Sequence, residues 1–348
     1  MEAKELNVAS FFSGAGGLDS GFSKRGFNIV IANDAWHDAC ETFKINHPDT
    51  TIFKKSISEL SSAEIKQALD EKGISEINVV IGAPPCQCFT RLNNEFLLKN
   101  KEDSRRELFR EYIKKIELLK PKLIFMENVR DLIARKDENG TPYNEVIVRE
   151  FKKAGYFCTH FILNTANFNV PQERKRIIFV ATNDSKIEEK IKSNADYFKK
   201  KSKSPLPVKK FLSKLSSKKN LKNHEISINE PLTLEKIRNV PQGGYYENLP
   251  DRLKTRKVRN GKEVIVKRYG SYYRRLHNDK PAKTITDNYI IHPTKDRFLT
   301  NREKAILHTF PLNYFFYGGM ESVSQQIANA VPPKFSSTIA DYALFLLN

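Results

Sequence analysis

A cysteine on a rigid turn is the first residue whose setting could support chemistry. Cys86 lies in Gly-Ala-Pro-Pro-Cys-Gln-Cys-Phe-Thr at residues 82–90, directly after an apolar run at residues 77–81 that predicts a buried strand. Pro84 and Pro85 must end that strand, because proline fixes φ and has no N–H. The cysteine thiolate is a strong nucleophile, and open α/β sheets bind ligands at the carboxyl ends of their strands. Cys86 is therefore a candidate nucleophile, and the alternative is a buried structural cysteine.

A glycine-rich turn and a following carboxylate predict a ligand site near the N-terminus. The turn Phe12-Ser13-Gly14-Ala15-Gly16-Gly17 follows an apolar run expected to be a strand. Glycine lets the backbone approach a ligand closely and leaves helix N–H groups accessible, although a purely structural turn would look the same. Asp34 ends the next strand, about 20 residues on, where a carboxylate can accept hydrogen bonds from ribose hydroxyls. Together these features predict a nucleoside-bearing cofactor.

Strands and helices alternate through the first half of the chain. Strands are expected at residues 7–12, 28–32, 52–53, 77–81, 122–126, 157–163 and 176–181, with helices to about 25 and at 38–45, 107–119 and 145–154. This alternation predicts an α/β fold with a doubly wound, largely parallel sheet of the Rossmann-like type. We expect a catalytic domain at 1–181, a smaller irregular domain at 182–320, and a C-terminal segment at 321–348 that returns to the first domain.

Composition narrows the class of protein. The chain has 348 residues, 39% hydrophobic and 29% charged, and no apolar run approaches the roughly 18 residues that a membrane helix needs. The N-terminus lacks a secretory pattern, and four cysteines without a regular framework favour a reducing cytoplasm. Cys86 and Cys88 have no second pair at zinc-ligand spacing, so no metal site is expected.

The charge predicts a polyanionic partner. The formal net charge is +18, and residues 199–222 contain ten lysines and no acidic residue among serines and prolines. Such an excess favours contacts with phosphates. We interpret the segment as a flexible basic linker or loop that faces nucleic acid, against the alternative of an ordinary solvated surface.

Six motifs in order resemble those of the S-adenosylmethionine-dependent DNA cytosine-5 methyltransferases, of the bacterial restriction–modification type. They are residues 12–17, Pro-Pro-Cys-Gln at 84–87, Glu-Asn-Val at 127–129, Gln-Glu-Arg-Lys-Arg at 172–176, Arg-Leu-His through Thr-Ile-Thr at 275–286, and Gln-Ile-Ala-Asn-Ala-Val-Pro at 326–332. The variable stretch of about 183–269 falls where that family carries its target-recognition domain.

The resemblance implies a role for individual residues. The implied catalytic groups are Cys86, Glu127, Arg174 and Arg176, with Cys86 attacking carbon 6 of a flipped cytosine, Glu127 contacting N3 and Arg176 contacting O2. The implied cofactor-binding residues are Phe12, Gly14, Ala15, Gly16, Gly17, Asp34, Ile57, Pro85, Leu108, Asn329, Ala330 and Val331. Residues 89–105 look like a loop that closes over double-stranded DNA. Candidate DNA contacts are Arg105, Lys199, Lys200, Lys201, Lys203, Arg238 and Gln242.

Three positions depart from the family's usual pattern. Ser56 stands where an acidic residue usually contacts the adenine, Ala328 replaces a glycine, and His308 replaces a glutamine. The same chemistry on transfer RNA is the nearest alternative, but that branch carries Cys-Phe-Thr well after the arginine pair, whereas here it lies at 88–90. A catalytically silent DNA-binding relative is the other alternative. The expected enzyme is a cytoplasmic monomer that protects DNA from a partner endonuclease.

Overall fold

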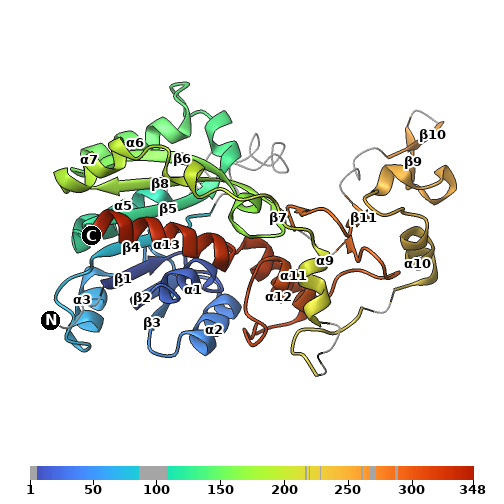
Figure 1. The fold of residues 1–348 in the computed structure, drawn as a ribbon, viewed down its shortest axis with the longest axis horizontal. Helices are drawn as coiled ribbons and strands as arrows, with labels where there is room; N and C mark the ends of the chain where they lie inside the picture. The colour runs from blue at the N-terminus through green and yellow to red at the C-terminus, as the bar shows by residue number, and fades with distance from the viewer. Residues whose placement is uncertain are drawn as a thin grey trace.

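A seven-stranded sheet forms the centre of the larger part of the molecule (Figure 1). The computed structural model describes residues 6–85, 108–215, 218, 220–227, 229–259, 262–266, 272–286 and 289–348. The strands of the sheet are β1 (Leu6–Phe11), β2 (Phe27–Asp34), β3 (Thr51–Lys54), β4 (Val79–Gly82), β5 (Leu123–Val129), β6 (Phe157–Asn164) and β8 (Lys175–Thr182).

The strand order confirms the expected doubly wound topology. It runs β3-β2-β1-β4-β5-β8-β6, and its pairs are parallel except those of β8, which is antiparallel to both β5 and β6. The carboxyl ends of the parallel strands therefore share one edge. The chain reverses direction across the sheet between β1 and β4, which is the kind of switch point where such sheets bind ligands.

Helices cover both faces of the sheet. Buried side chains alternate between the faces along β4, where Val80 packs into one core cluster while Val79 and Ile81 pack into the other. The cluster around Val80 includes α3 (Ser62–Asp70), α5 (Leu108–Leu119) and α6 (Tyr143–Lys153). The opposite cluster includes α1 (Gly17–Ser23), α2 (His37–Asn46), α7 (Ser185–Ser193), α8 (Tyr197–Lys200) and α13 (Pro333–Leu347). The helix that ends the chain thus packs against α1, near the beginning of the chain.

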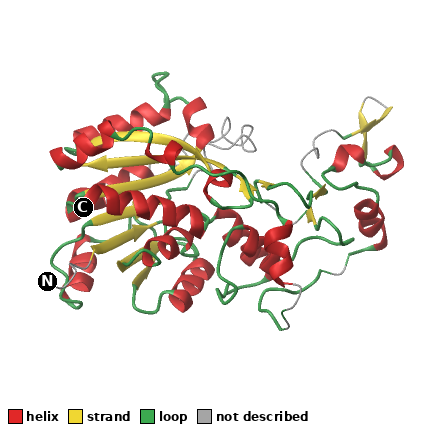
Figure 2. Cartoon of the chain, in the orientation of Figure 1, coloured by secondary structure: helices red, strands yellow, loops and turns green. Residues whose placement is uncertain are grey.

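A second, smaller lobe lies to the right in Figure 2 and consists largely of loops. Its elements, with those that join it to the sheet, are β7 (Gln172–Glu173), α9 (Lys209–Leu212), α10 (Pro231–Arg238), β9 (Arg256–Arg259), β10 (Lys262–Ile265), β11 (Arg274–Arg275), β12 (Ala282–Lys283), β13 (Ile290–Ile291), α11 (Asn301–Leu307) and α12 (Met320–Asn329). Short 3-10 turns cover Arg130–Ala134, Thr165–Phe168, Ser213–Leu215, Tyr246–Asn248 and Asp251–Leu253. Within the described ranges, no helix is long and apolar enough to cross a membrane.

The core of the sheet extends past the predicted domain boundary at residue 182. Ile187 and Ile191 of α7 and Phe198 of α8 belong to the same buried cluster as α13. A boundary at 182 would separate these side chains from the core in which they are buried. We infer that the smaller lobe begins after α8.

The basic segment at 199–222 differs from the flexible linker that its composition predicts. Val208, Phe211, Leu212 and Leu215 are buried, and α9 packs its apolar side chains against α11. Apolar residues three or four positions apart anchor one side of this segment, while its lysines project from the other. In its described residues, the segment is therefore a packed surface and not a free linker.

Candidate active site

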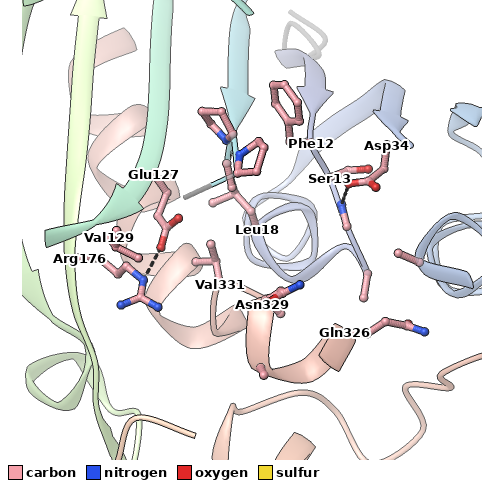
Figure 3. A pocket seen from close by; sticks show the side chains of 18 of the residues that line it. Phe12, Ser13, Leu18, Asp34, Glu127, Val129, Arg176, Gln326, Asn329 and Val331 are labelled. Atoms are coloured by element: carbon pink, nitrogen blue, oxygen red, sulfur yellow. Dashed lines mark hydrogen bonds and ion pairs between the residues drawn. The ribbon is translucent and has the colours of Figure 1, made fainter. Parts of the chain in front are cut away.

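A cavity of about 910 Å³ lies at the carboxyl edge of the sheet (Figure 3). The loops after β1, β2, β4 and β5 meet there with residues from β8 and from the segment that follows α12. Its lining includes Phe12, Ser13, Gly14, Ala15, Leu18, Asn33, Asp34, Trp36, Ser56, Ile57, Pro84, Pro85, Leu108, Glu127, Val129, Arg174, Arg176, Thr284, Thr286, Gln326, Asn329, Ala330 and Val331. Most of the residues expected to bind a cofactor or act in catalysis therefore surround one space.

Asp34 joins the ends of β1 and β2 through its two carboxylate oxygens. The Gly14 N–H donates to Oδ2 at 2.8 Å, and the Trp36 N–H donates to Oδ1 at 2.8 Å. Burial raises the pKa of Asp34 above its usual value, and these backbone donors oppose that shift. A carboxylate has about four acceptor positions, so Asp34 can hold the glycine-rich turn and still accept a hydroxyl from a ligand.

The glycine-rich turn presents backbone to the cavity. Phe12 has φ of 54°, an uncommon conformation for a bulky residue that marks local strain at this turn. Gly14 has φ of 53°, and a Cβ added there would meet no atom within 4 Å. Its backbone therefore faces open space, which a ligand can approach closely.

Gly16 and Gly17, which were also expected to bind the cofactor, are tightly packed. Neither lines the cavity; they pack against elements behind it. A Cβ on Gly16 would lie 2.7 Å from the Tyr314 hydroxyl oxygen, and one on Gly17 would lie 2.3 Å from the Val331 carbonyl oxygen. Gly17 lets the segment after α12 approach α1, so that Ala330 and Val331 can form the far wall. Gly16 leaves room for Tyr314, whose hydroxyl donates to the Ala15 carbonyl oxygen.

The cavity combines aromatic, aliphatic and polar surfaces that suit a nucleoside. Trp36 follows Asp34 at the end of β2, and Ile57 is buried in the loop after β3. Beside Ile57, the Ser56 hydroxyl interacts with that of Ser58 at 2.9 Å, and its N–H donates to Glu59. Leu108 begins α5 on the side of the turn after β4.

Glu127 and Arg176 form an ion pair inside the cavity. Arg176 Nε lies 2.8 Å from Glu127 Oε1, and each side chain is only 11% exposed. The antiparallel register of β5 and β8 brings them together, because Arg176 lies opposite Val129, two residues beyond Glu127. Figure 3 shows both side chains directed into the same space. A carboxylate and a guanidinium are thus held side by side with little water around them.

Arg174 lies between β7 and β8 and reaches the far wall. It is 4% exposed, and one guanidinium nitrogen donates to the Asn329 carbonyl oxygen at 3.4 Å. Behind it, His308 Nδ1 lies 3.2 Å from Gln172 Nε2, while Gln172 Oε1 accepts from the Ile285 N–H. Burial, with the charges of Arg174 and Arg176, holds the pKa of His308 well below its usual value. The histidine is therefore neutral and accepts from Gln172.

The turn that carries the candidate nucleophile is fixed up to its last described residue. Asn128 Nδ2 donates to the Pro84 carbonyl oxygen at 3.2 Å, which ties the turn to β5. A Cβ on Gly82 would lie 2.6 Å from the Tyr112 ring, so only glycine fits between β4 and α5. Pro85 lines the cavity, and Cys86 is the next residue in the sequence. Cys86 and Arg105 lie outside the described residues.

The other expected DNA contacts are spread over two parts of the molecule. Lys199 and Lys200 belong to α8 on the larger part, Lys201 and Lys203 follow it, and Lys200 pairs with Asp196 at 3.0 Å. Arg238 ends α10 in the smaller lobe and is 62% exposed, with Asp296 at 4.0 Å. Gln242 instead bridges two loops, since its Nε2 donates to Pro293 and its Oε1 accepts from Asn278.

Several lining residues were not predicted. Trp36 could have been found as an aromatic residue two positions after Asp34. Gln326 is buried and accepts from Thr42 at 2.6 Å, which fixes α12 against α2. Thr284 and Thr286 come from the smaller lobe; both belong to the motif at 275–286, but no role was assigned to either residue.

Comparison with known proteins identifies the family. The family described as C-5 cytosine-specific DNA methylase matches residues 6–343. The chain belongs to this family. Members use S-adenosylmethionine as methyl donor, so the expectations of an S-adenosylmethionine-dependent enzyme and of DNA cytosine-5 methylation are confirmed.

The matched relatives and structures extend over nearly the whole chain. The chain is 30% identical over 349 residues to the Type II methyltransferase M1.HphI of Haemophilus parahaemolyticus, covering 97% of this chain and 87% of that protein. It is 30% identical over 351 residues to M.MthTI of Methanothermobacter thermautotrophicus, covering 96% of each. A putative DNA modification methyltransferase encoded within a prophage (E. coli) has a TM-score of 0.75 at 20% identity, with 99% of this chain and 100% of that chain covered. The last likeness shows a shared fold.

Proposed function

We propose that this methylase transfers a methyl group to carbon 5 of a cytosine within a specific duplex DNA sequence, through a covalent adduct with Cys86. The observation that carries the proposal is the buried pair Glu127–Arg176, which shares a cavity with the Asp34-anchored turn and with Pro85, the residue before Cys86. A nucleophile, an acid–base carboxyl, a cation and a nucleoside site are the groups that this reaction needs.

Cys86 would begin the reaction. Carbon 5 of cytosine is a poor nucleophile, but addition of the thiolate sulfur to carbon 6 moves an electron pair onto carbon 5. S-adenosylmethionine supplies an electrophilic methyl group. Carbon 5 forms a bond to that methyl group as the methyl–sulfur bond breaks, and the cofactor sulfur keeps the bonding electron pair as a neutral thioether. A base then takes the carbon 5 proton, and elimination of the thiolate restores the aromatic ring and frees Cys86.

Glu127 and Arg176 would stabilise the ring as charge develops. Glu127 would hydrogen-bond N3 and move a proton there, and Arg176 would hold O2. The 2.8 Å contact between them supports this assignment, because it orients both groups before a base enters. Arg174, held against the far wall through Asn329, would add positive charge to the same pocket.

The remaining lining would hold the cofactor. Asp34 would accept the ribose hydroxyls, and Gly14 and Ala15 would let the cofactor lie against backbone. Phe12, Ile57, Pro85 and Leu108 would cover its apolar parts, opposite Asn329, Ala330 and Val331. In place of the acidic residue that usually holds the adenine, we propose stacking on Trp36 and contact with Ser56. Gly16 and Gly17 would act indirectly, through packing.

A cytosine inside a duplex must leave the base stack to reach this cavity. We propose that Lys199, Lys200, Lys201, Lys203 and Arg105 contact phosphates, while Arg238 acts nearer the bases. The methylase would act as a cytoplasmic monomer, and a partner endonuclease would cut the same site when it is unmethylated. The names of the Type II relatives support this pairing.

Two single-atom variants test the proposed nucleophile. Cys86→Ser should abolish transfer of labelled methyl groups to duplex DNA while S-adenosylmethionine binding persists, because a neutral hydroxyl is a far weaker nucleophile than a thiolate. Cys88→Ser, two residues away, is the matched control and should keep its turnover. Activity of Cys86→Ser within tenfold of wild type would refute the assignment.

A further inference from the structure

The two-stranded ribbon of β9 and β10 is largely exposed on both faces. All four residues of β9 are exposed, as are the first three of β10. Val258 is 68% exposed and Val264 is 37% exposed, although valine is usually buried. In Figure 1 the ribbon projects from the end of the smaller lobe that lies farthest from the sheet. Both faces of the ribbon are therefore open to a partner.

The register divides the ribbon into two unlike faces. Antiparallel pairing sets Lys257 opposite Val264 and Arg259 opposite Lys262, so these four side chains share one face. Arg256, Val258, Glu263 and Ile265 share the other. The ion pair between Arg256 and Glu263 at 3.1 Å agrees with this division, because both residues lie on the second face.

All charged residues of the first face are basic. It carries Lys257, Arg259 and Lys262 around one apolar side chain, Val264, and no acidic residue. Within the described part of the chain, none of its three cations has an ion-pair partner. On the second face, by contrast, Glu263 neutralises Arg256. The unbalanced charge is therefore confined to one side of the ribbon.

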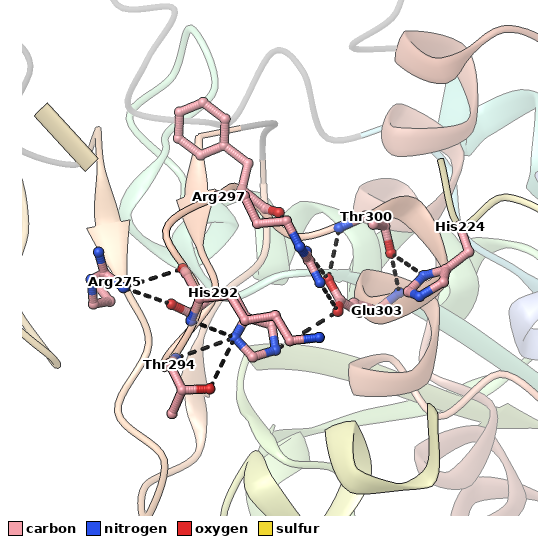
Figure 4. Close-up of polar contacts among 9 residues, drawn as sticks. His224, Arg275, His292, Thr294, Arg297, Thr300 and Glu303 are labelled. Carbon is pink, nitrogen blue, oxygen red and sulfur yellow. Dashed lines mark hydrogen bonds and ion pairs between the residues drawn. The ribbon is translucent and has the colours of Figure 1, made fainter. Parts of the chain in front are cut away.

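The lobe that carries the ribbon is held firmly by buried polar contacts (Figure 4). Arg275 is 7% exposed and donates to the carbonyl oxygens of Val240, Ile237, His292 and Lys295, and to Asp296. Nearby, Arg297 makes two contacts of 2.7 Å with the buried Glu303 carboxylate. A rigid support of this kind lets exposed side chains read a ligand with geometric accuracy.

We propose that the face formed by Lys257, Arg259, Lys262 and Val264 enters the major groove of the duplex that carries the target cytosine. This inference rests on the proposed function. Four residues per strand extend roughly 13 Å, and the major groove, about 12 Å wide, admits a two-stranded ribbon. Arg259 belongs to the pair next to residues 260–261, and it reads a base edge. Lys257 and Lys262 bind phosphates, and Val264 makes an apolar contact with a base.

Two arginines on the same strand provide a matched test. Arg259→Ala and Arg256→Ala each remove one positive charge from an exposed position, but from opposite faces. Each variant would methylate a pool of unmethylated duplexes with randomised sequence, and bisulfite sequencing would give its preference at every position. Arg259→Ala should reduce discrimination at one base pair by roughly tenfold to a hundredfold. Arg256→Ala should keep the wild-type profile.

The outcomes distinguish a failure of the proposed reading face from a failure of the proposed function. An unchanged profile for Arg259→Ala, or an equal change for Arg256→Ala, would overturn the proposed reading face. A uniform loss of rate for Arg259→Ala with the profile retained would show a phosphate contact and overturn base reading. The double variant Lys257→Ala/Lys262→Ala should weaken binding to all duplexes alike and flatten its salt dependence. If wild-type protein methylates no cytosine in the pool, the proposed function itself fails.

Discussion

Replacing Asp34 should weaken cofactor binding in two measurable steps. Its carboxylate accepts two backbone N–H groups, from Gly14 and Trp36, each at 2.8 Å. Hydrogen bonds to a charged group are each worth about 1.5–3 kcal/mol. Asp34→Asn keeps one acceptor oxygen and turns an N–H₂ group toward the other donor, so it should lose about one bond. Asp34→Ala should lose both, together with any contact to a ribose.

The expected change in affinity follows from these losses. A turn that has lost these bonds must be ordered when the cofactor binds, and that cost lowers the affinity. One lost bond should weaken S-adenosylmethionine binding about tenfold to a hundredfold, and Asp34→Ala should weaken it further. Calorimetric titration gives the affinities, and Asp49→Asn, an exposed carboxylate away from the cavity, is the control. Affinities within twofold of wild type for both Asp34 variants would refute the reasoning.

Two other substitutions test packing and burial. Gly17→Ala should destabilise the fold by about 1–3 kcal/mol in denaturant unfolding, because its Cβ would lie 2.3 Å from the Val331 carbonyl oxygen, whereas Gly319→Ala meets nothing within 4 Å and should be nearly neutral. Burial raises the pKa of Asp19 from 3.8 to about 7. Between these two pH values the folded protein keeps a proton on Asp19, whereas the unfolded chain has lost it. The stability of wild type minus that of Asp19→Asn should therefore fall by about 1.4 kcal/mol per pH unit as pH rises from 4 to 7, and a flat difference would count against a buried, protonated Asp19.

The sequence predicts those parts of the fold that depend on local pattern. Apolar runs such as residues 77–81 mark buried strands, and the motif residues mark the ends of those strands. α3 and α7 were missed because their exposed faces are strongly polar and each buries few side chains, Ile65 and Ala68 in one and Ile187 and Ile191 in the other. The prediction of a flexible linker at 199–222 was wrong for a related reason. The many lysines dominate its composition, although Phe211 and Leu215 between them are buried.

The candidate site was predicted residue by residue but not as a set of contacts. The pair of Glu127 and Arg176 depends on the antiparallel register between β5 and β8, which no local pattern reveals. The same limit applies to Gly17. A side chain there would clash with the Val331 carbonyl oxygen, and Val331 lies more than 300 residues away in the sequence. Long-range packing decides such roles, and the resemblance to a family had to supply what spacing alone could not.

The position of the transferred methyl group tests the central claim most directly. The purified methylase would be incubated with unmethylated duplex DNA and with transfer RNA, in the presence of S-adenosylmethionine that carries an isotopically labelled methyl group. Mass spectrometry of the digested nucleosides would locate the label. We expect 5-methylcytosine from the duplex alone, and none with Cys86→Ser. Label on another base or on an exocyclic nitrogen, label in the RNA alone, or label retained with Cys86→Ser would contradict the account.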